Sequence, residues 1–269
     1  MDYSGKVAWI TGASSGIGAA LAREVAARGA HVVLSGRDEA RLTEVAADCG
    51  ESLLLPFDVR DDAALADATA KAIAWKGGVD IAFANAGVSQ RSRALNTDMQ
   101  VYRDIIAIDL TAQIAFSQGL IGHMAERGSG ALGFISSIAG KVGVPMRTAY
   151  CAAKFGLAGY ADALRAELSQ SGVSVHTIYP GSVATNVSRN ALTGAGEARG
   201  RSDKAIDEGI PAEVAALQML DGIAAGQREI IIAEGAEQAM GELRRTPDTL
   251  FDSVAGMVAA GYMDKMEQG

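Results

Sequence analysis

The sequence predicts an α/β fold in which helices cover both faces of a doubly wound, seven-stranded parallel sheet. Short apolar runs rich in β-forming residues alternate with longer alanine-rich segments whose apolar residues recur at helical spacing. Few hairpin signals separate the apolar runs, so consecutive strands are expected to be parallel and joined by right-handed crossovers. The runs are also apolar on both faces, as in a sheet that is covered from each side.

Seven strand candidates and five helical segments follow one another along the chain. The strands are predicted at residues 6–10, 31–34, 52–55, 79–84, 131–136, 173–179 and 229–233. The helices are predicted at residues 19–28, 39–49, 62–75, 101–127 and 149–170. No linker or change of composition divides the chain, so we predict one domain over residues 1–269.

Residues 182–209 depart from this alternation because they are polar and rich in Gly, Ala and charged side chains. The segment follows the carboxyl end of a predicted strand, where ligands bind in open α/β sheets. We therefore predict that it forms a substrate lid. The alternative is an exposed connection without a function.

Composition narrows the classes of partner and cellular compartment. The chain has 269 residues and a formal net charge of −8, which argues against a nucleic-acid-binding surface. Its two cysteines, Cys49 and Cys151, fit a reducing compartment, and no Cys/His spacing predicts a metal site. No basic leader or membrane-spanning run is recognised. We expect a cytoplasmic protein with no membrane, nucleic-acid or metal partner.

A glycine-rich stretch, TGASSGIG at residues 11–18, joins the first strand candidate to the first helix. Glycines with the spacing G-x-x-x-G-x-G allow the backbone to approach a pyrophosphate, which the helix N-terminus attracts. Tight strand-to-helix packing is the alternative explanation. The motif predicts a Rossmann-type dinucleotide site. Its predicted cofactor-binding residues are Gly12, Ser14, Ser15, Gly16, Ile17 and Gly18.

The end of the second strand candidate indicates which dinucleotide binds. Gly36 stands where an NAD site carries an acidic residue, and Arg37 follows it. A guanidinium suits a 2′-phosphate, and Ser14 can add a neutral hydrogen bond. Asp38 is expected to cap the helix that begins near Glu39. NADP(H) is therefore favoured as the cofactor, with NAD(H) possible.

Five motifs occur in one order along the chain: TGASSGIG, FDVRD, FANAG, the spacing Ser137…Tyr150-x-x-x-Lys154, and YPGSVAT. Together they make residues 6–232 resemble the short-chain dehydrogenase/reductase family in its compact, single-domain, NADP-preferring form. The C-terminal residues 235–269 look like the short helical tail of some members. The resemblance implies further cofactor-binding roles for Asp58, Val59, Asn85, Ala86, Gly87, Tyr150, Lys154, Pro180, Gly181, Val183 and Thr185.

Tyr150 and Lys154 lie four residues apart on a predicted helix and therefore share a face. Tyrosine ordinarily has a pKa of about 10, and a nearby cation favours its anionic form. The pair can thus serve as a general acid/base. The family spacing selects Ser137, not Ser136, to hold the substrate oxygen.

These roles imply an oxidoreductase that transfers a hydride between NADP(H) and a carbonyl compound or secondary alcohol. The first alternative is a non-catalytic NADP-binding redox sensor or scaffold that retains the fold. The second is a sugar-nucleotide epimerase or dehydratase, which normally needs a longer C-terminal substrate domain.

Asp109, in the segment IAIDLTA, stands where family members usually carry an asparagine that holds a relay water. A carboxylate accepts hydrogen bonds but cannot donate as an amide does, and its charge would stabilise a nearby Lys154 ammonium. A working variant, a weakened enzyme and an adapted pH optimum are all compatible with this change. We hypothesise that Asp109 is a catalytic residue that still orders water.

The substrate pocket is expected between residues 88–95, 138–148 and the lid. These stretches carry Arg91, Arg93, Lys141 and Arg147, which invite an anionic substrate, although loop cations are more often solvated. The small-molecule substrate itself is not specified.

The family resemblance implies a homodimer or homotetramer formed through helices 101–127 and 149–170. The apolar residues considered for that contact are Ile105, Ile114, Phe116, Phe155 and Leu164.

Overall fold

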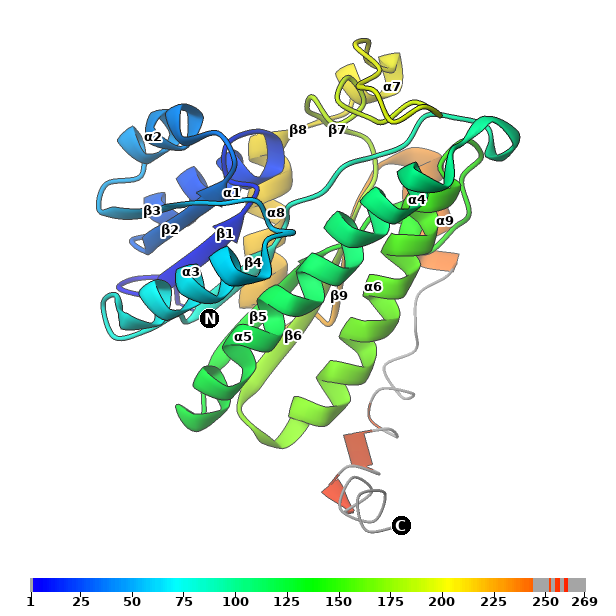
Figure 1. Cartoon of the computed structure of the whole chain (residues 1–269). Helices are drawn as coiled ribbons and strands as arrows, with labels where there is room; N and C mark the ends of the chain where they lie inside the picture. Colours follow the sequence, from blue (N-terminus) through cyan, green and yellow to red (C-terminus); the bar gives the residue numbers. More distant parts are fainter. Residues whose placement is uncertain (1, 244–251, 253–254, 257–258, 261–269) are drawn as a thin grey trace.

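The computed structural model describes residues 2–243, 252, 255–256 and 259–260. A seven-stranded, all-parallel sheet with the order β3-β2-β1-β4-β5-β6-β9 forms its centre (Figure 1). The strands are β1 (Val7–Thr11), β2 (His31–Gly36), β3 (Ser52–Pro56), β4 (Ile81–Ala84), β5 (Gly130–Ile135), β6 (Val173–Pro180) and β9 (Glu229–Ile232). The predicted fold class is confirmed. The strand order reverses between β1 and β4, which places the ligand-binding crevice of such sheets at their carboxyl ends.

Helices cover both faces of the sheet, as predicted. One face packs against α1 (Gly16–Ala27), α2 (Glu39–Ala47) and α8 (Ala212–Ala224). The other packs against α3 (Asp62–Ala74), α5 (Ala112–Glu126) and α6 (Thr148–Glu167), the last of which ends in a 3₁₀ turn, η4 (Leu168–Gln170). Helix α8 was not among the predicted helices, although it supplies a large part of the core on its face.

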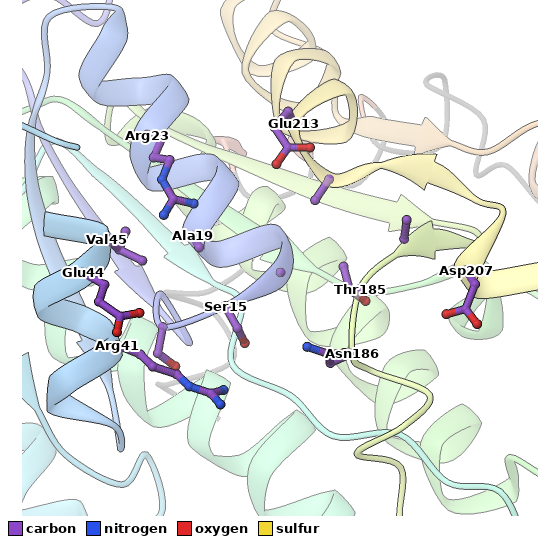
Figure 2. A pocket seen from close by; sticks show the side chains of 14 residues that line it. Ser15, Ala19, Arg23, Arg41, Glu44, Val45, Thr185, Asn186, Asp207 and Glu213 are labelled. Atoms are coloured by element: carbon purple, nitrogen blue, oxygen red, sulfur yellow. The ribbon is translucent and has the colours of Figure 1, made fainter. Parts of the chain in front are cut away.

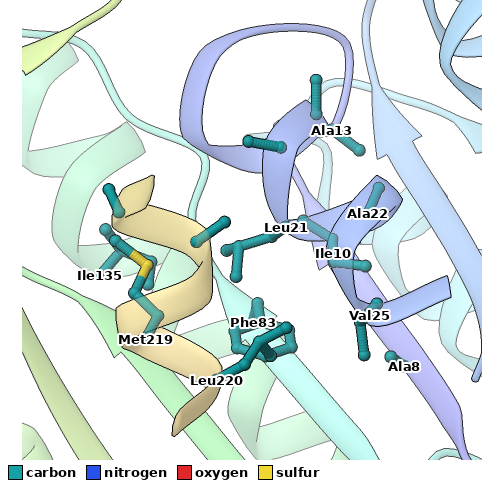
Figure 3. Close-up of a cluster of buried hydrophobic side chains, with 14 of the residues drawn as sticks. Ala8, Ile10, Ala13, Leu21, Ala22, Val25, Phe83, Ile135, Met219 and Leu220 are labelled. Atoms are coloured by element: carbon teal, nitrogen blue, oxygen red, sulfur yellow. The ribbon is translucent and has the colours of Figure 1, made fainter. Parts of the chain in front are cut away.

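The first strand shows why the strand runs are apolar throughout. Ala8 and Ile10 of β1 face the cluster with α1 and α8, whereas Val7 and Trp9 face the cluster with α5. Figure 3 shows the first cluster, in which Ile10 lies beside Ala22 and Val25 of α1, and to which Met219 and Leu220 of α8 also belong. Successive strand residues point to opposite faces, so a sheet buried on both faces needs apolar side chains at every position.

The predicted helix 101–127 is observed as one continuous helix that contains an irregular turn. It consists of α4 (Met99–Ile106), a π-helical turn η2 (Ala107–Thr111) and α5. Asp109 lies in that turn and is fully buried. By length and composition, helix 99–126 could also cross a membrane, but here it packs on the sheet through Phe116, Leu120 and Met124.

Residues 182–209 lie beyond the carboxyl edge of the sheet and contain β7 (Val183–Ala184) and α7 (Lys204–Asp207). Strand β7 pairs in parallel with β8 (Ile210–Pro211) to form a second, two-stranded sheet that the sequence did not predict. Helix α9 (Gly235–Leu243) begins the predicted helical tail. Most of the tail that follows residue 243 lies outside the described residues.

Candidate functional site

A cavity of about 740 Å³ opens at the carboxyl ends of the central strands. This volume is in the usual range for small-molecule and cofactor sites. The structure brings every predicted catalytic and cofactor-binding residue to its walls. They are Gly12, Ser14, Ser15, Gly16, Ile17, Gly18, Arg37, Asp58, Val59, Asn85, Ala86, Gly87, Asp109, Ser137, Tyr150, Lys154, Pro180, Gly181, Val183 and Thr185.

The glycine-rich loop is shaped by backbone contacts that leave no room for side chains. Gly12 has a φ of +67°, and a Cβ atom at Gly18 would lie 2.3 Å from the Gly12 carbonyl oxygen. The Asn85 side-chain amide donates to the Thr11 carbonyl at 2.8 Å. The Thr11 hydroxyl in turn accepts from the backbone N–H groups of Asn85 and Ala86. These hydrogen bonds fix the glycine-rich loop between β1 and the end of β4.

The N-terminus of α1 points into this cradle without a side-chain cap. Its N-cap residue is Ser15, whose side chain accepts no hydrogen bond from the helix. The first backbone N–H groups are therefore available to an anion, and the helix dipole favours one there. The glycine cradle and the uncapped helix end fit the pyrophosphate of a dinucleotide.

The end of β2 offers a cation and no carboxylate to the cavity. Gly36 is buried, and a Cβ atom there would lie 3.3 Å from the Ser14 hydroxyl oxygen. Arg37 is exposed and lines the cavity. The carboxylate of Asp38 accepts from the Arg41 backbone N–H at 3.1 Å, so its predicted role as the N-cap of α2 is confirmed.

Asp58 has an ion-pair partner that the sequence analysis missed. The Arg60 guanidinium binds both carboxylate oxygens of Asp58, with Nη2 2.7 Å from Oδ2 and Nε 3.1 Å from Oδ1. Hydrogen bonds from Arg60, assisted by the charge of Arg37, lower the pKa of Asp58. Two guanidiniums, those of Arg37 and Arg60, thus line this end of the cavity. The spacing D-x-R was the available signal.

At the opposite end of the cavity, helix α6 presents Tyr150 and Lys154. The Lys154 Nζ atom is buried, donates to the Ile135 carbonyl at 2.9 Å and lies 5.6 Å from the centre of the Tyr150 ring. The shared helix face expected from the four-residue spacing is observed. The lysine is held by the end of β5, so its position relative to the tyrosine depends on the sheet as well as on the helix.

The two serines after β5 have different surroundings. The Ser136 hydroxyl donates to the Lys154 carbonyl at 3.0 Å, which anchors α6 to the end of β5. The Ser137 hydroxyl accepts from the Ala139 N–H at 3.1 Å and donates to the Pro180 carbonyl at 3.3 Å. Both serines line the cavity, and both donate to a backbone carbonyl, Ser136 to Lys154 and Ser137 to Pro180. The selection of Ser137 for the substrate oxygen stays a prediction.

Asp109 forms a buried ion pair with Lys154. Its Oδ1 atom accepts from the Val88 N–H at 2.8 Å, and its Oδ2 atom lies 3.3 Å from Lys154 Nζ without a hydrogen bond. A Cβ atom at Gly87 would lie 3.0 Å from Oδ2, so glycine makes room for this carboxylate. Burial raises the pKa of Asp109, and the Lys154 charge opposes that shift. A π-helical turn often marks a functional site.

Two of the four cations expected around the substrate, Lys141 and Arg91, have acidic partners, so the view that they are solvated is wrong for these two. Lys141 is buried and pairs with Glu229 at 2.9 Å, and its ammonium lies 4.3 Å from the centre of the Tyr179 ring. The Arg91 Nε atom is 2.6 Å from an Asp203 oxygen, and its side chain is only 7% exposed. Only Arg93 is exposed as a solvated loop cation would be.

Segment 182–209 supplies cavity residues that the sequence analysis did not single out. Val187, Asn190, Leu192, Gly196 and Ala198 all line the cavity. The segment is held to residues 89–98 by backbone hydrogen bonds from Leu192 N–H to the Ser89 carbonyl and from Arg91 N–H to the Leu192 carbonyl. The signal that could have found these residues is their position directly after the motif YPGSVAT. Asn186 of the same segment and Val88 of the predicted pocket stretch 88–95 also line the cavity, and the wall residues outside the predicted stretches include Phe57, Asp104, Ile108 and Ile135.

A second hollow of about 570 Å³ lies on the outer side of the glycine-rich loop (Figure 2). Figure 2 shows Arg23 and Arg41 on one wall and Asp207 and Glu213 on the opposite wall. Ser15 lines both hollows, so this one adjoins the main cavity. Arg23 and Arg41 already pair with acids of their own neighbourhood. Among the residues that the structure describes, no group of three or more His, Cys, Asp or Glu side chains could hold a metal ion.

Known protein sequences match this chain over most of its length. The family described as "short chain dehydrogenase" matches residues 6–195. "Dehydrogenase/reductase SDR family member 7B" of Danio rerio is 35% identical over 238 residues, which cover 85% of this chain and 77% of that protein. "Dehydrogenase/reductase SDR family member 7" of Homo sapiens is 36% identical over 202 residues, covering 72% and 60%, respectively.

Solved structures match the fold at low sequence identity. A short-chain dehydrogenase/reductase from Burkholderia phymatum, crystallised in complex with NAD, has a TM-score of 0.81 and 22% identity, with 92% of this chain and 98% of that chain covered. Levodione reductase has a TM-score of 0.78 and 24% identity, with 88% and 99% covered. These structural matches support the same sheet and helix arrangement.

Proposed function

Because this chain belongs to the short-chain dehydrogenase/reductase family of oxidoreductases, which act on CH–OH groups, we propose that it transfers a hydride between NADP(H) and a small carbonyl compound or secondary alcohol. Tyr150 is the proposed general acid/base. One observation carries this proposal. The buried Lys154 ammonium lies beside the Tyr150 ring in the cavity that also contains the glycine-rich loop.

The residues at the end of the cavity have complementary proposed roles. A bound nicotinamide cofactor supplies or accepts the hydride. In the reductive direction Tyr150 gives its hydroxyl proton to the carbonyl oxygen, while the Ser137 hydroxyl donates a hydrogen bond to the same oxygen. The charge of Lys154 favours the tyrosinate that remains. Lys154 is also proposed to bind the nicotinamide ribose, and Asp109 to order water near it.

The preference for NADP(H) is proposed from the adenosine end. Gly36 is buried at the end of β2 and has no acidic side chain there. Arg37 is exposed at the cavity wall, where its guanidinium can bind a 2′-phosphate. Ser14 can add a neutral hydrogen bond. Asp58 remains the proposed partner of the adenine amino group, and its carboxylate is held at the cavity wall by the ion pair with Arg60.

The general acid/base role is tested by Tyr150→Phe in the full-length protein. Reduction of a panel of ketones and aldehydes is followed by loss of NADPH absorbance, and NADPH binding is measured by fluorescence. We expect the variant to bind NADPH normally and to lose at least about 100-fold in kcat, the lower end of the range for a removed general acid. Unchanged turnover would refute this mechanism. If the wild-type protein binds NADPH but turns over no compound of the panel, the alternative of a redox sensor or scaffold is favoured.

The cofactor preference is tested by Arg37→Gln, with Arg93→Gln as a matched control on an exposed loop. Loss of one charge-assisted contact of about 1.5–3 kcal/mol predicts roughly 10- to 100-fold weaker NADP(H) binding. NAD(H) binding should change little, because it lacks the 2′-phosphate. Equal losses for both cofactors would show that Arg37 does not select between them.

A cytoplasmic, membrane-independent homodimer or homotetramer is also proposed. The exposed part of Phe155 on α6 and the half-buried Ile114 on α5 support a contact through these helices. Three other residues that were considered for this contact, Ile105, Phe116 and Leu164, are instead buried in the core. Sedimentation of the wild-type protein and of Phe155→Glu tests the contact, and fractionation of cells tests the location.

A further inference from the structure

We propose that Glu237 of helix α9 is a positioning residue for the reactive end of the cavity, because its carboxylate holds the turn formed by residues 180–182. This inference rests on the proposed function, in which that turn borders the site of hydride transfer. It gives the helical tail, which has no other assigned role, a part in the proposed reaction.

The turn at residues 180–182 lies directly beside the proposed substrate-binding hydroxyl. Pro180 ends β6, and both Pro180 and Gly181 line the cavity. The Pro180 carbonyl accepts a hydrogen bond from the Ser137 hydroxyl at 3.3 Å. Because Ser137 is proposed to hold the substrate oxygen, a displacement of this turn would disturb the place where hydride and proton are transferred.

Glu237 binds the turn with both of its carboxylate oxygens. Its Oε2 atom accepts from the Ser182 backbone N–H at 2.7 Å, and its Oε1 atom accepts from the Ser182 hydroxyl at 3.0 Å. The Glu237 side chain is half-buried. Hydrogen bonds to an ionised acceptor are stronger than neutral ones, and two parallel bonds fix orientation as well as distance. The carboxylate therefore sets the position of the Ser182 backbone.

The same turn is also held by the backbone that leads from β9 into α9. The Gly181 N–H donates to the carbonyl of Ile232, the last residue of β9, at 2.9 Å. A Cβ atom at Gly181 would collide with the Glu237 carboxylate and would lie 3.0 Å from the Ala233 Cβ atom. Glycine at position 181 thus allows the turn to pack directly against the side chain that binds it.

Helix α9 contacts the loop after β5 as well as the turn after β6. Gly241 lies four residues after Glu237 and shares its helix face. Gly241 is buried, and a Cβ atom there would lie 2.8 Å from the Ile138 Cδ1 atom. Ile138 follows Ser137 and begins the 3₁₀ turn η3 (Ile138–Gly140). One face of α9 therefore supports both the segment that carries Ser137 and the turn to which its hydroxyl donates.

The role of Glu237 is tested by Glu237→Ala in the full-length protein. Turnover is measured as NADPH oxidation with the ketone and aldehyde panel, and calorimetry measures the binding of 2′-phospho-ADP-ribose, which is NADP(H) without the nicotinamide. We expect kcat to fall roughly 10- to 100-fold, because a misplacement of about 1 Å can cost on the order of 100-fold. The affinity for 2′-phospho-ADP-ribose and its number of sites per chain should not change, because the glycine-rich loop holds that part of the cofactor.

The conservative variant Glu237→Gln separates geometry from other effects of the change. Its amide oxygen can accept from the Ser182 N–H, and its amide nitrogen can donate to the Ser182 hydroxyl. We expect this variant to keep most of the wild-type kcat. Gln238→Ala, at the next and exposed position of α9, is the matched control and should leave kcat unchanged.

Ser182→Ala tests the same contact from the side of the turn. It removes the bond from the hydroxyl but keeps the bond from the backbone N–H, so its kcat should lie between those of the wild type and Glu237→Ala. The double variant Ser182→Ala, Glu237→Ala should be no slower than Glu237→Ala alone, because both changes remove one shared interaction.

The inference is overturned if Glu237→Ala keeps the wild-type kcat, or if Glu237→Gln loses as much as Glu237→Ala. It is also overturned if the fall in kcat equals a fall in the number of sites for 2′-phospho-ADP-ribose, because the variant would then be unfolded and not mispositioned. None of these outcomes affects the proposed function as long as Tyr150→Phe is inactive. Active Tyr150→Phe protein would refute the proposed general acid/base, and a wild-type protein without turnover of any compound of the panel would refute both proposals.

Discussion

The nucleotide side and the substrate side of the cavity are built in different ways. On the nucleotide side, the glycine-rich loop is held by backbone groups and by the short side chains of Thr11 and Asn85. On the substrate side, long side chains form ion pairs: Arg91–Asp203 joins residues 88–98 to residues 182–209, and Lys141–Glu229 joins residues 138–148 to β9. The glycine-rich loop on the first side depends on backbone geometry, and the loops on the second side depend on ion pairs.

This difference indicates where each side can tolerate change. The glycine-rich loop has no space for an added side-chain atom, but its shape does not depend on a charged side chain. An ion-pair framework admits changes of shape, but a charge that loses its partner inside the protein is costly. The two sides should therefore fail in different ways when they are altered, the nucleotide side in binding and the substrate side in stability.

The largest effect is expected from Lys141→Met, which leaves Glu229 buried beside Tyr179 without its ammonium partner. Glu229 and Lys141 have side chains that are 2% and 3% exposed. Breaking such a pair typically costs about 3–5 kcal/mol in the free energy of unfolding. Chemical denaturation of the wild type and the variant measures the loss.

The matched control is the double variant Lys141→Met, Glu229→Leu, which removes both charges. Replacing a buried pair by apolar side chains is often neutral, so this variant should recover most of the lost stability. A double variant as unstable as the single one would show that the substrate side depends on packing and not on charge balance.

The next effect is expected from Gly18→Ala on the nucleotide side. The new Cβ atom would lie 2.3 Å from the Gly12 carbonyl oxygen and 2.5 Å from the Asn85 amide nitrogen, so the loop must move. A displacement of about 1 Å at such a site costs on the order of 100-fold, which we expect in the affinity for NADPH. Fluorescence titration with NADPH measures it.

Gly159→Ala on α6 is the control, because a Cβ atom there meets nothing within 4 Å. It should leave NADPH affinity unchanged and stabilise the protein by about 0.5–1 kcal/mol, since alanine is the better helix former. Weakened binding by this variant would mean that the assay reports general disturbance and not the shape of the loop.

The features that the sequence could predict are those that depend on local patterns. The seven strands, the helices on both faces and the glycine cradle depend on local patterns, such as the periodicity of apolar residues and the run TGASSGIG, and they were predicted. Tyr150 and Lys154 were placed correctly on one helix face because helix geometry fixes residues four apart. The Asp38 cap was predicted for the same local reason.

The parts that could not be predicted depend on residues far apart in the chain. Lys141 and Glu229 are 88 residues apart, and Arg91 and Asp203 are 112 apart. No local pattern tells whether such a cation meets water or a distant carboxylate. The pairing of β7 with β8 is likewise not encoded by a hairpin signal, because these short strands are parallel and separated by the segment 185–209.

A smaller effect is expected from pH, through the buried His176 of β6. Burial, and then the charge of Arg165, lower the pKa of His176, which contacts the Gln227 carbonyl and the Ser174 hydroxyl. The unfolded chain therefore takes up a proton at about pH 6.5 while the folded protein does not. The free energy of unfolding should fall as the pH drops below about 6.5, by up to about 1.4 kcal/mol per pH unit.

Denaturation curves between neutral and mildly acidic pH measure this dependence, and His176→Gln provides the comparison. The variant has no ionisable group at this position, so its stability should fall less steeply than that of the wild type over the same interval. Equal slopes would assign the acid sensitivity to other groups.

The smallest effect concerns Met146, four residues before Tyr150, where the substrate side includes a backbone feature of its own. Its φ is +64°, a left-handed conformation that costs a residue with a Cβ atom about 1 kcal/mol. The carbonyl of Met146 accepts from the Ser92 N–H at 3.1 Å, which joins the loops 88–98 and 138–148. Met146→Gly should relieve the strain, and the greater freedom of glycine in the unfolded chain should limit the gain in stability to less than about 1 kcal/mol.

Lys76→Gly is the comparison variant, because Lys76 has a φ of +47° and lies on the loop before β4, away from the cavity. This change also removes the Lys76–Glu51 ion pair at 2.8 Å, which is compared separately with Lys76→Ala. Relief of strain alone predicts similar small gains for both variants in thermal unfolding. Only Met146→Gly should also change KM, because it loosens a junction of the substrate side. If Met146→Gly alters neither stability nor KM, the left-handed residue has no part in holding the two loops together, and the substrate side depends on its ion pairs alone.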